Sequence, residues 1–305
     1  MTRLSGNGFD VTADLLEDMA RGAAFLGAGG GGDPYLGAMT ALHAIQTYGA
    51  PHCVPASAIG DDDAVYTAAM MGAPTVMVEK LTGIEEVEAA IAALERVMGK
   101  PAKAILPAEI GGLNALVPVA VAAKRGLPLI DADGMGRAFP ELQMVTFAVD
   151  GVSTSPLAVC NEHGEYHVIN ARNNKASEDA ARRLVIEMGA AVGVSCYPMD
   201  GATAKRSAVH GTLSLAYGIG KAISDGRRRG DPFDSLIAYL KSTDYYNKCG
   251  IIFSGKVVDL DRRTERGFTL GACKVLSNEG DGSELLHLYL QVRRGDENHR
   301  LANLG

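Results

Sequence analysis

Apolar and polar residues follow two different periods along the first half of the chain. Apolar residues recur at helical spacing over residues 11–24, 34–49, 84–99 and 112–126, which predicts four helices. Short apolar runs over 52–59, 74–81, 103–109, 127–134 and 143–151 predict strands between these helices. Because strands that alternate with helices form βαβ units, the pattern predicts a mainly parallel sheet.

The pattern changes near Gly151, where shorter and more polar segments follow. Residues 155–171 are typical of two strands around a turn, and residues 248–276 are typical of a β-hairpin. Helices are expected over 177–190, with Ser177 as the N-cap, and over 211–224, with a strand at 191–198 between them. The sequence therefore predicts an α/β protein of two domains. An N-terminal α/β domain would cover 1–160, and a C-terminal β-rich α+β domain would cover 161–305.

The composition restricts the classes of partner. The chain carries 36 acidic and 29 basic residues, a net charge of −7, and an acidic surface repels a phosphate backbone, so we expect no nucleic acid partner. No apolar run reaches the roughly 18 residues of a membrane helix, so we expect no membrane partner. The N-terminus lacks the apolar segment of a signal peptide, and the five cysteines form no CxxC pair. These observations favour a cytoplasmic protein and leave a homo-oligomer open.

The stretch GAGGGG, Gly27 to Gly32, has the letters of a dinucleotide-binding loop. That motif also needs a clear preceding strand and an acidic residue about 20 positions later. The preceding strand is short at best, and the acids at 61–63 lie too far along the chain. Because no Gly-Lys-Ser/Thr follows the glycines either, we expect neither NAD nor ATP as a cofactor.

Glycine-rich backbone that leads into a helix N-terminus still presents N–H groups to an anion. We therefore predict an anion- or substrate-binding group that consists of Gly29, Gly30, Gly31, Gly32, Asp33 and Asn114. Asp33 is also well placed to cap a helix that starts at Pro34. The alternative interpretation of the glycines is a tight turn at which two elements pack closely.

Two predicted strands of the first domain end in acidic residues. Glu109 ends the strand at 103–109, and Asp131 and Asp133 lie near the end of the strand at 127–134. Ligands of open parallel sheets bind beyond the carboxyl ends of the strands, so these carboxylates are candidates for a site. Asp131 and Asp133 are two residues apart in extended chain and are expected to share one face.

Clustered carboxylates bind a divalent cation, share a proton in acid–base catalysis, or form ion pairs. The candidate catalytic residues are accordingly Glu109, Asp131, Asp133, Arg137 and Glu141. Asp131 and Asp133 are also the candidate ligands of one divalent metal ion. The ion-pair alternative, with Arg137 as the neighbouring cation, stays open at this point.

The segments GAGGGGDPY, LPAEIGGLNA and PLIDADGMGRAFPELQM occur in this order, and GKVVDLDRRTERGFTLG follows later. The first three resemble the S-methyl thiohydantoin desulfurase family, which was long filed as a domain of unknown function and is related to hydantoinase and oxoprolinase proteins; the fourth is a looser match. The resemblance extends from about Asp14 to about Tyr289. It implies an α/β N-terminal domain, a β-rich C-terminal domain, and chemistry on a five-membered thiohydantoin ring.

The resemblance implies an enzyme, a hydrolase that acts on the C–S bond of a cyclic thioamide or thioimidate. Water would attack the ring carbon that bears sulfur, and a hydantoin would form as a thiol or sulfide leaves. Carboxylates, or a metal ion bound by them, would activate the water, and Arg137 would pair with a carboxylate of the small-molecule substrate. The alternative function is a non-catalytic ligand-binding or regulatory subunit associated with hydantoinase- or oxoprolinase-type enzymes.

The sequence after Gln291, VRRGDENHRLANLG, is polar and shows no further strand pattern, whereas members of this family usually continue with more C-terminal domain. We therefore expect the C-terminal domain to be incomplete from Val292 on, through truncation or a shifted reading frame. Such an end would leave a sheet edge exposed.

Overall fold

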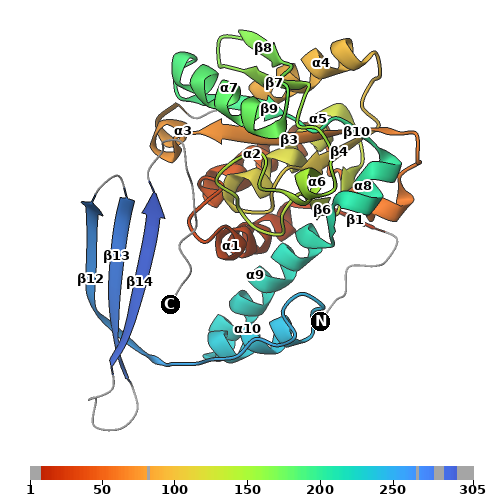
Figure 1. The fold of residues 1–305 in the computed structure, drawn as a ribbon. Helices are drawn as coiled ribbons and strands as arrows, with labels where there is room; N and C mark the ends of the chain where they lie inside the picture. The colour runs from red at the N-terminus through yellow and green to blue at the C-terminus, as the bar shows by residue number, and fades with distance from the viewer. Residues whose placement is uncertain (1–7, 81–82, 266–267, 278–284, 294–305) are drawn as a thin grey trace. The chain divides into compact units, whose positions relative to one another are not determined.

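The computed structural model of the chain describes residues 8–80, 83–265, 268–277 and 285–293 (Figure 1). The chain divides into two compact units, Met1–Tyr239 and Leu240–Gly305. Within the described residues, no helix combines the length and the apolar character that crossing a membrane requires. The division at residue 160 that the sequence suggested stays a prediction.

One mixed sheet forms the centre of the first unit, with the strand order β1-β2-β5-β4-β3-β9-β7-β8 and with β10 paired to β3. Its strands are β1 (Phe9–Asp10), β2 (His52–Val54), β3 (Ala64–Gly72), β4 (Ala104–Pro107), β5 (Leu129–Ile130), β7 (Leu157–Cys160), β8 (Tyr166–Ile169), β9 (Ala191–Ser195) and β10 (Met199–Asp200). Strands β2, β5, β4 and β3 pair in parallel, and the others join antiparallel. A short second sheet pairs β6 (Ala132–Asp133) with β11 (Val209–His210).

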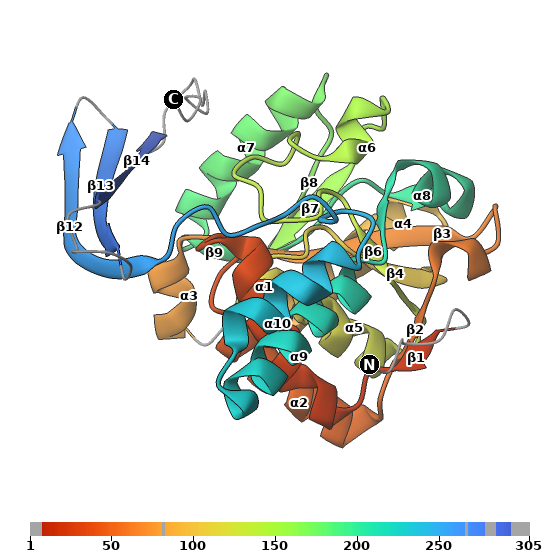
Figure 2. The same ribbon diagram turned by 90° about the horizontal axis from the view of Figure 1, so that it is seen from below.

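Helices lie on both faces of this sheet, as the two views show (Figures 1 and 2). The α-helices are α1 (Leu16–Gly27), α2 (Pro34–Tyr48), α3 (Pro74–Lys80), α4 (Glu85–Met98), α5 (Val117–Arg125), α6 (Thr146–Val149), α7 (Asn174–Glu187), α8 (Gly201–Ser207), α9 (Thr212–Arg229) and α10 (Pro232–Lys241). The described residues also contain the 3₁₀ turns η1 (Ala13–Leu15), η2 (Ala56–Ala58) and η3 (Gly112–Ala115). The predicted α/β fold with a parallel βαβ core is confirmed, and antiparallel strands extend its sheet.

The two faces of β9 show how strand alternation separates the helix layers. Val192 and Val194 pack into a core cluster that includes Ala181 and Val185 of α7. Gly193, between them, points the other way, and a Cβ there would lie 2.3 Å from the backbone of α4. Because successive strand residues alternate between faces, α7 and α4 cover opposite sides of the sheet.

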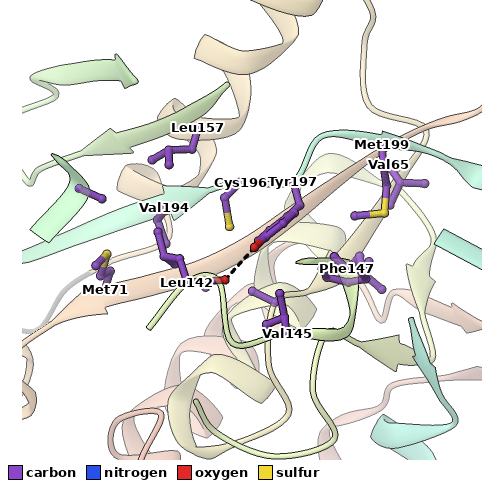
Figure 3. Packing of buried hydrophobic residues seen from close by; sticks show 14 of the residues in the cluster. Val65, Met71, Leu142, Val145, Phe147, Leu157, Val194, Cys196, Tyr197 and Met199 are labelled. Carbon is purple, nitrogen blue, oxygen red and sulfur yellow. Dashed lines mark hydrogen bonds between the residues drawn. The ribbon is translucent and has the colours of Figure 1, made fainter. Parts of the chain in front are cut away.

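The core cluster on the α7 side also fixes the loop that follows β6. Tyr197 is 2% exposed, and its hydroxyl donates a hydrogen bond of 2.9 Å to the carbonyl of Leu142 (Figure 3). Its ring packs against Phe147 with 5.4 Å between the centroids. A buried tyrosine needs a hydrogen-bond partner for its hydroxyl, and here the loop supplies it. The pair of Tyr197 and Phe147 therefore holds the loop in place.

Three local predictions were wrong. Residues 74–81 were expected as a strand, but Pro74–Lys80 form α3, since proline is favoured at the first position of a helix. Residues 143–151 were also expected as a strand and contain α6. Helix α7 begins earlier than expected, because the side chain of Asn173, not that of Ser177, caps it by accepting from the Ala176 amide at 2.9 Å.

The strand β3 escaped the sequence analysis altogether. Its residues AVYTAAMMG are rich in alanine and methionine, which carry little strand preference. It is nevertheless the strand that joins the two halves of the sheet: residues 65–68 pair in parallel with β4, and residues 69–72 pair antiparallel with β9.

The second unit contains an antiparallel sheet of β12 (Gly255–Glu265), β13 (Phe268–Ser277) and β14 (Leu285–Arg293). The predicted hairpin is therefore confirmed, with a register shift between Val257 and Asp259. Strand β14 includes Val292 and Arg293, and residues 294–305 lie outside the described residues. The expectation of an incomplete domain stays a prediction.

Helices α1 and α9 approach each other so closely that each contributes a glycine to the contact. A Cβ added to Gly22 of α1 would lie 1.7 Å from the carbonyl oxygen of Ala216, and one added to Gly220 of α9 would lie 1.7 Å from that of Asp18. Neither distance leaves room for a methyl group. The helices are therefore in backbone contact, and α9 is held beside α1 (Figure 2).

The substitution Gly22→Ala is expected to destabilise the protein by about 3 kcal/mol because the added methyl overpacks this contact, although alanine is the better helix former. Urea denaturation followed by circular dichroism measures the loss. Ala24→Ser, at an exposed position of the same helix, is the control and should change the stability by less than about 0.5 kcal/mol. A Gly22→Ala protein as stable as the wild type would show that the helices are not in fixed contact.

Candidate functional site

A cavity of about 160 Å³ lies where β3 and β4 end at their carboxyl ends and β9 joins β3. Its lining includes Glu109 and Asn114, which follow β4, and Gly31 and Gly32 from the loop between α1 and α2. The other walls come from β3, β9, the loop at 139–142, Met77 of α3, Cys196 and Arg182 of α7. The cavity therefore occupies the position at which ligands of open α/β sheets bind.

Glu109 is the acidic group of this cavity. Its side chain is buried, with 4% of the residue exposed. Oε1 accepts a hydrogen bond of 2.6 Å from Asn114 Nδ2, and Oε2 accepts one of 2.9 Å from the amide of Phe139. Each carboxyl oxygen thus receives one N–H from a different segment of the chain, which fixes the orientation of the group.

The side chain of Asn114, which binds Glu109, is itself fixed by hydrogen bonds. Its Oδ1 accepts from the amide of Met70 at 2.7 Å, and its Nδ2 donates to the carbonyl of Met70 at 3.0 Å. The side-chain amide therefore pairs with both polar groups of one β3 residue, as a neighbouring strand would. The same Nδ2 then has one N–H left for Glu109.

Burial and hydrogen bonding act in opposite directions on Glu109. Burial in the cavity favours the neutral acid, whereas the two N–H donors favour the carboxylate. The effect of burial is the larger, and it raises the pKa of Glu109 to about 7. A carboxyl group with this pKa can take up and return a proton near neutral pH.

The glycine loop joins two helices rather than a strand and a helix. Helix α1 continues to Gly27, and Asp33 caps α2 by accepting from the Tyr35 amide at 2.8 Å. A dinucleotide loop needs the strand that is missing here. The predicted cap at Asp33 and helix start at Pro34 are confirmed, and Asp33 itself is exposed.

The glycines are needed because a second glycine segment lies directly against them. A Cβ on Gly31 would lie 2.1 Å from the carbonyl oxygen of Gly111, and one on Gly112 would lie 2.3 Å from that of Gly32. The amides of Leu113 and Asn114 donate to the carbonyls of Gly32 and Gly31 at 3.3 and 3.2 Å. Close packing, the alternative interpretation, is thus present, and this contact places Asn114 in the cavity wall.

The amides of this loop differ in what they offer a ligand. The Gly30 amide donates to the carbonyl of Gly27 at 2.8 Å, and Gly29 is exposed. Gly31 and Gly32 line the cavity, and within the described residues their amides make no hydrogen bond. These two N–H groups are therefore the part of the predicted anion-binding group that a ligand in the cavity can use. Their role in binding stays a prediction.

Asp131 and Asp133 do not line this cavity, and they serve different segments. Asp131 accepts hydrogen bonds from the amides of Leu213 and Ser214, at 2.9 and 3.1 Å, and from the Ser214 hydroxyl, so it caps α9. Asp133 is fully buried and accepts from the amides of Met135 and Gly136 at 3.1 and 2.9 Å. Burial raises its pKa to about 7.

Both aspartates use each of their oxygens as hydrogen-bond acceptors, so neither presents an unengaged oxygen to a cation. Across the described ranges, no three His, Cys, Asp or Glu side chains gather as a metal site would require. The residues in this arrangement do not fit a divalent ion. The metal predicted at Asp131 and Asp133 is thus left without structural support and stays a prediction.

Arg137 and Glu141 lie on the loop after β6 but outside the cavity lining. Arg137 is exposed. Glu141 is buried; it accepts from the side-chain amide of Gln143 and lies 3.9 Å from Lys175 Nζ. The catalytic roles assigned to both residues stay predictions.

The sequence analysis missed Arg182, which lines the cavity from α7. The helical pattern marks it as a surface residue, and no local motif indicates a site. Cys196 also lines the cavity, and burial raises the pKa of its thiol to about 12. The thiol therefore stays protonated, as expected of a core cysteine.

The packing of the glycine loop gives a matched pair of substitutions. Gly31 has φ +78° and no room for a methyl group, whereas Gly29 has φ +94° with nothing within 4 Å of an added Cβ. Gly29→Ala should cost about 1–2 kcal/mol from the left-handed backbone alone, and Gly31→Ala about 2 kcal/mol more from the clash. Equilibrium urea unfolding compares the two. Equal losses would contradict the close contact with Gly111.

Models of one protein family match nearly the whole chain. The family model described as "S-Me-THD-like, N-terminal domain" matches residues 14–171, and that described as "S-Me-THD-like, C-terminal domain" matches residues 172–299. An X-ray crystal structure of a protein from Chromobacterium violaceum is similar, with a TM-score of 0.70 and 25% identity over 93% of this chain and 77% of that one. No protein of curated function matches.

Proposed function

Because the chain belongs to the S-Me-THD-like family, we propose that it hydrolyses the C–S bond of a thiohydantoin-type ring, with Glu109 as the general base. The observation that carries this proposal is the state of Glu109. Its carboxyl group is buried in the cavity, is oriented by two N–H donors, and has a pKa raised to about 7. A cavity of about 160 Å³ suits one small ring better than a nucleotide.

The reaction on an S-methyl thiohydantoin balances with one water molecule. Glu109 as carboxylate takes a proton from water, and the oxygen bonds to the ring carbon that bears sulfur. The ring nitrogen of the C=N bond gains the electron pair and, in the end, the second water proton. The C–S bond then breaks, Glu109 returns its proton to the leaving sulfur, and the products are a hydantoin and methanethiol.

The groups around Glu109 have supporting roles in this scheme. Negative charge that develops in the tetrahedral intermediate needs fixed donors, and the amides of Gly31 and Gly32 are available to supply them. Asn114 keeps the carboxyl group aimed into the cavity. Asp131 and Asp133 would support the scheme only indirectly, through α9 and through the loop that carries Phe139.

The pH dependence of turnover tests the role of Glu109. A general base acts as carboxylate, so with a pKa of about 7 the value of kcat/KM should fall about tenfold per pH unit below pH 7 and level off above it. Glu109→Gln should lower kcat/KM by about 10²- to 10⁴-fold. Hydantoin formation and thiol release from an S-methyl thiohydantoin measure both. Glu86→Gln is the control, since Glu86 is a buried glutamate of α4 outside the cavity.

The same assay separates the remaining alternatives. Elemental analysis before and after chelation, with turnover measured on each sample, tests the predicted metal ion. Turnover that is lost on chelation and restored by the metal would remove Glu109 as the sole activator of water. A folded wild-type protein that binds hydantoins but releases no thiol would instead support the ligand-binding subunit.

A further inference from the structure

The loop that carries Phe139 lines the cavity and is held by side chains rather than by a helix or a strand. The Phe139 amide donates to Glu109 at 2.9 Å and so orients one oxygen of the proposed base. Three residues later, both backbone groups of Leu142 are bound. Its amide donates to Glu178 at 3.0 Å, and its carbonyl accepts from the Tyr197 hydroxyl at 2.9 Å. The position of the Phe139 amide therefore depends on the side chains that hold Leu142.

Tyr197 has an unusual backbone conformation for a residue with a large side chain. Its φ is +50°, in the left-handed region that residues other than glycine rarely adopt. Such a conformation persists only where the surroundings hold it. Here the Tyr197 amide donates to the carbonyl of Thr154 at 3.1 Å, and the ring packs against Phe147. The chain thus keeps Tyr197 in a strained conformation in which its hydroxyl reaches the Leu142 carbonyl.

The hydroxyl of Tyr197 donates throughout the pH range in which Glu109 titrates. Burial raises the pKa of Tyr197 well above its ordinary value, so the hydroxyl stays protonated. Leu142 is only 6% exposed, and a buried carbonyl that loses its donor is costly. Without the Tyr197 hydroxyl, the loop would therefore move until the Leu142 carbonyl finds another donor.

Several charged or titratable groups lie around Glu109. Of the described residues that line the cavity, Arg182 and Cys196 are the others of this kind, and burial raises the pKa of the Cys196 thiol to about 12. Behind the lining, Glu178 of α7 binds Arg182. Asp133 of β6 accepts from the amide that follows Glu109 in the chain, and its pKa is raised to about 7. Replacement of a tyrosine by phenylalanine changes no charge, so the electrostatic effect of these groups on Glu109 stays the same.

We propose that Tyr197 is a positioning residue for Glu109. It holds the loop through the Leu142 carbonyl and so keeps the Phe139 amide against the carboxyl group. Tyr197 is not among the described residues that line the cavity, so it acts through the loop. Glu178 has the corresponding role at the Leu142 amide. The inference rests on the proposed function, because Glu109 is the base in that reaction.

The substitution Tyr197→Phe keeps the ring and removes the hydroxyl. The Phe139 bond should weaken, and because an N–H donor favours the carboxylate, the pKa of Glu109 should rise by about 0.5 to 1 pH unit. The value of kcat/KM at about pH 6 should then fall about three- to ninefold, whereas the value at about pH 9 should stay within about twofold. The NMR chemical shift of the Phe139 amide, followed over the same pH range, measures the midpoint without turnover.

Tyr66→Phe is the matched control. Tyr66 is 1% exposed, and its hydroxyl donates to the carbonyl of Lys100 at 2.8 Å, so this variant loses the same kind of hydrogen bond outside the cavity. Both variants should lower the melting temperature by a similar amount, but only Tyr197→Phe should move the midpoint. The Gly136 amide, which donates to Asp133, should keep its own midpoint in both variants.

A midpoint in Tyr197→Phe equal to that of the wild type would overturn the inference, and so would a loss of kcat/KM that is the same at every pH. If Tyr197→Phe does not fold, Glu178→Gln decides. Loss of the Glu178 charge alone would lower the pKa of Glu109, whereas a displaced loop would raise it. A higher midpoint in Glu178→Gln therefore supports the inference, and an unchanged or lower one overturns it.

The NMR readout separates this inference from the proposed function. If the wild type turns over no thiohydantoin but the midpoint of the Phe139 amide rises in Tyr197→Phe, the positioning role stands and the hydrolytic function fails. If the wild type turns over thiohydantoins and the midpoint stays in place in Tyr197→Phe, the function stands and the inference fails. If the Phe139 amide does not titrate in the wild type, the inference is overturned whatever the turnover.

Discussion

The pairing of the Asn114 side chain with the backbone of Met70 is the interaction on which the candidate site depends. This pairing attaches η3 to Met70, near the end of β3. It leaves one N–H of the Asn114 side chain for Glu109. An amide that satisfies the backbone of a strand cannot rotate without leaving buried polar groups unpaired. The sheet therefore sets the direction of one oxygen of the Glu109 carboxyl group, through the Asn114 side chain, and the amide of Phe139 sets the other.

The two glycine segments make this arrangement possible. The loop between α1 and α2 and the turn at Gly111 and Gly112 touch through backbone atoms, so η3 sits directly on the loop. Side chains at these positions would push Asn114 away from Met70. Glu178 and Arg182 hold the loop at 139–142, which also lines the cavity. The contact between the glycine segments and the contact of α7 with the loop at 139–142 therefore both border the cavity. The strands β3 and β9, at which the parallel and antiparallel parts of the sheet join, also line it.

The sequence was informative wherever the signal was local. Helix periods, the cap at Asp33 and the hairpin were predicted because neighbouring residues determine them. Glu109 was a candidate because an acid at the end of a strand is conspicuous in a parallel sheet, and Asn114 was a candidate for the anion-binding group; both line the cavity. Strand β3 was missed because its many alanine and methionine residues show little preference for strands. The segment forms a strand because it is buried in the middle of the sheet. Arg182 was missed because its place in the cavity depends on how α7 packs, and no neighbouring residue encodes that. Asp131 and Asp133 bind different segments, α9 and the turn at 135–136, which their spacing in the sequence could not show, and the metal ion expected there stays a prediction.

The hydrogen bonds of Glu109 have a consequence for proton transfer. Both of its oxygens accept an N–H, and each oxygen keeps a second lone pair that can take a proton. A protonated oxygen is the weaker acceptor, so the bond from Asn114 or Phe139 is weaker in the acid than in the carboxylate. Burial favours the acid and these two bonds favour the carboxylate, and the balance between them lies near neutral pH. A shift of the loop that carries Phe139 would therefore change the pKa of the group.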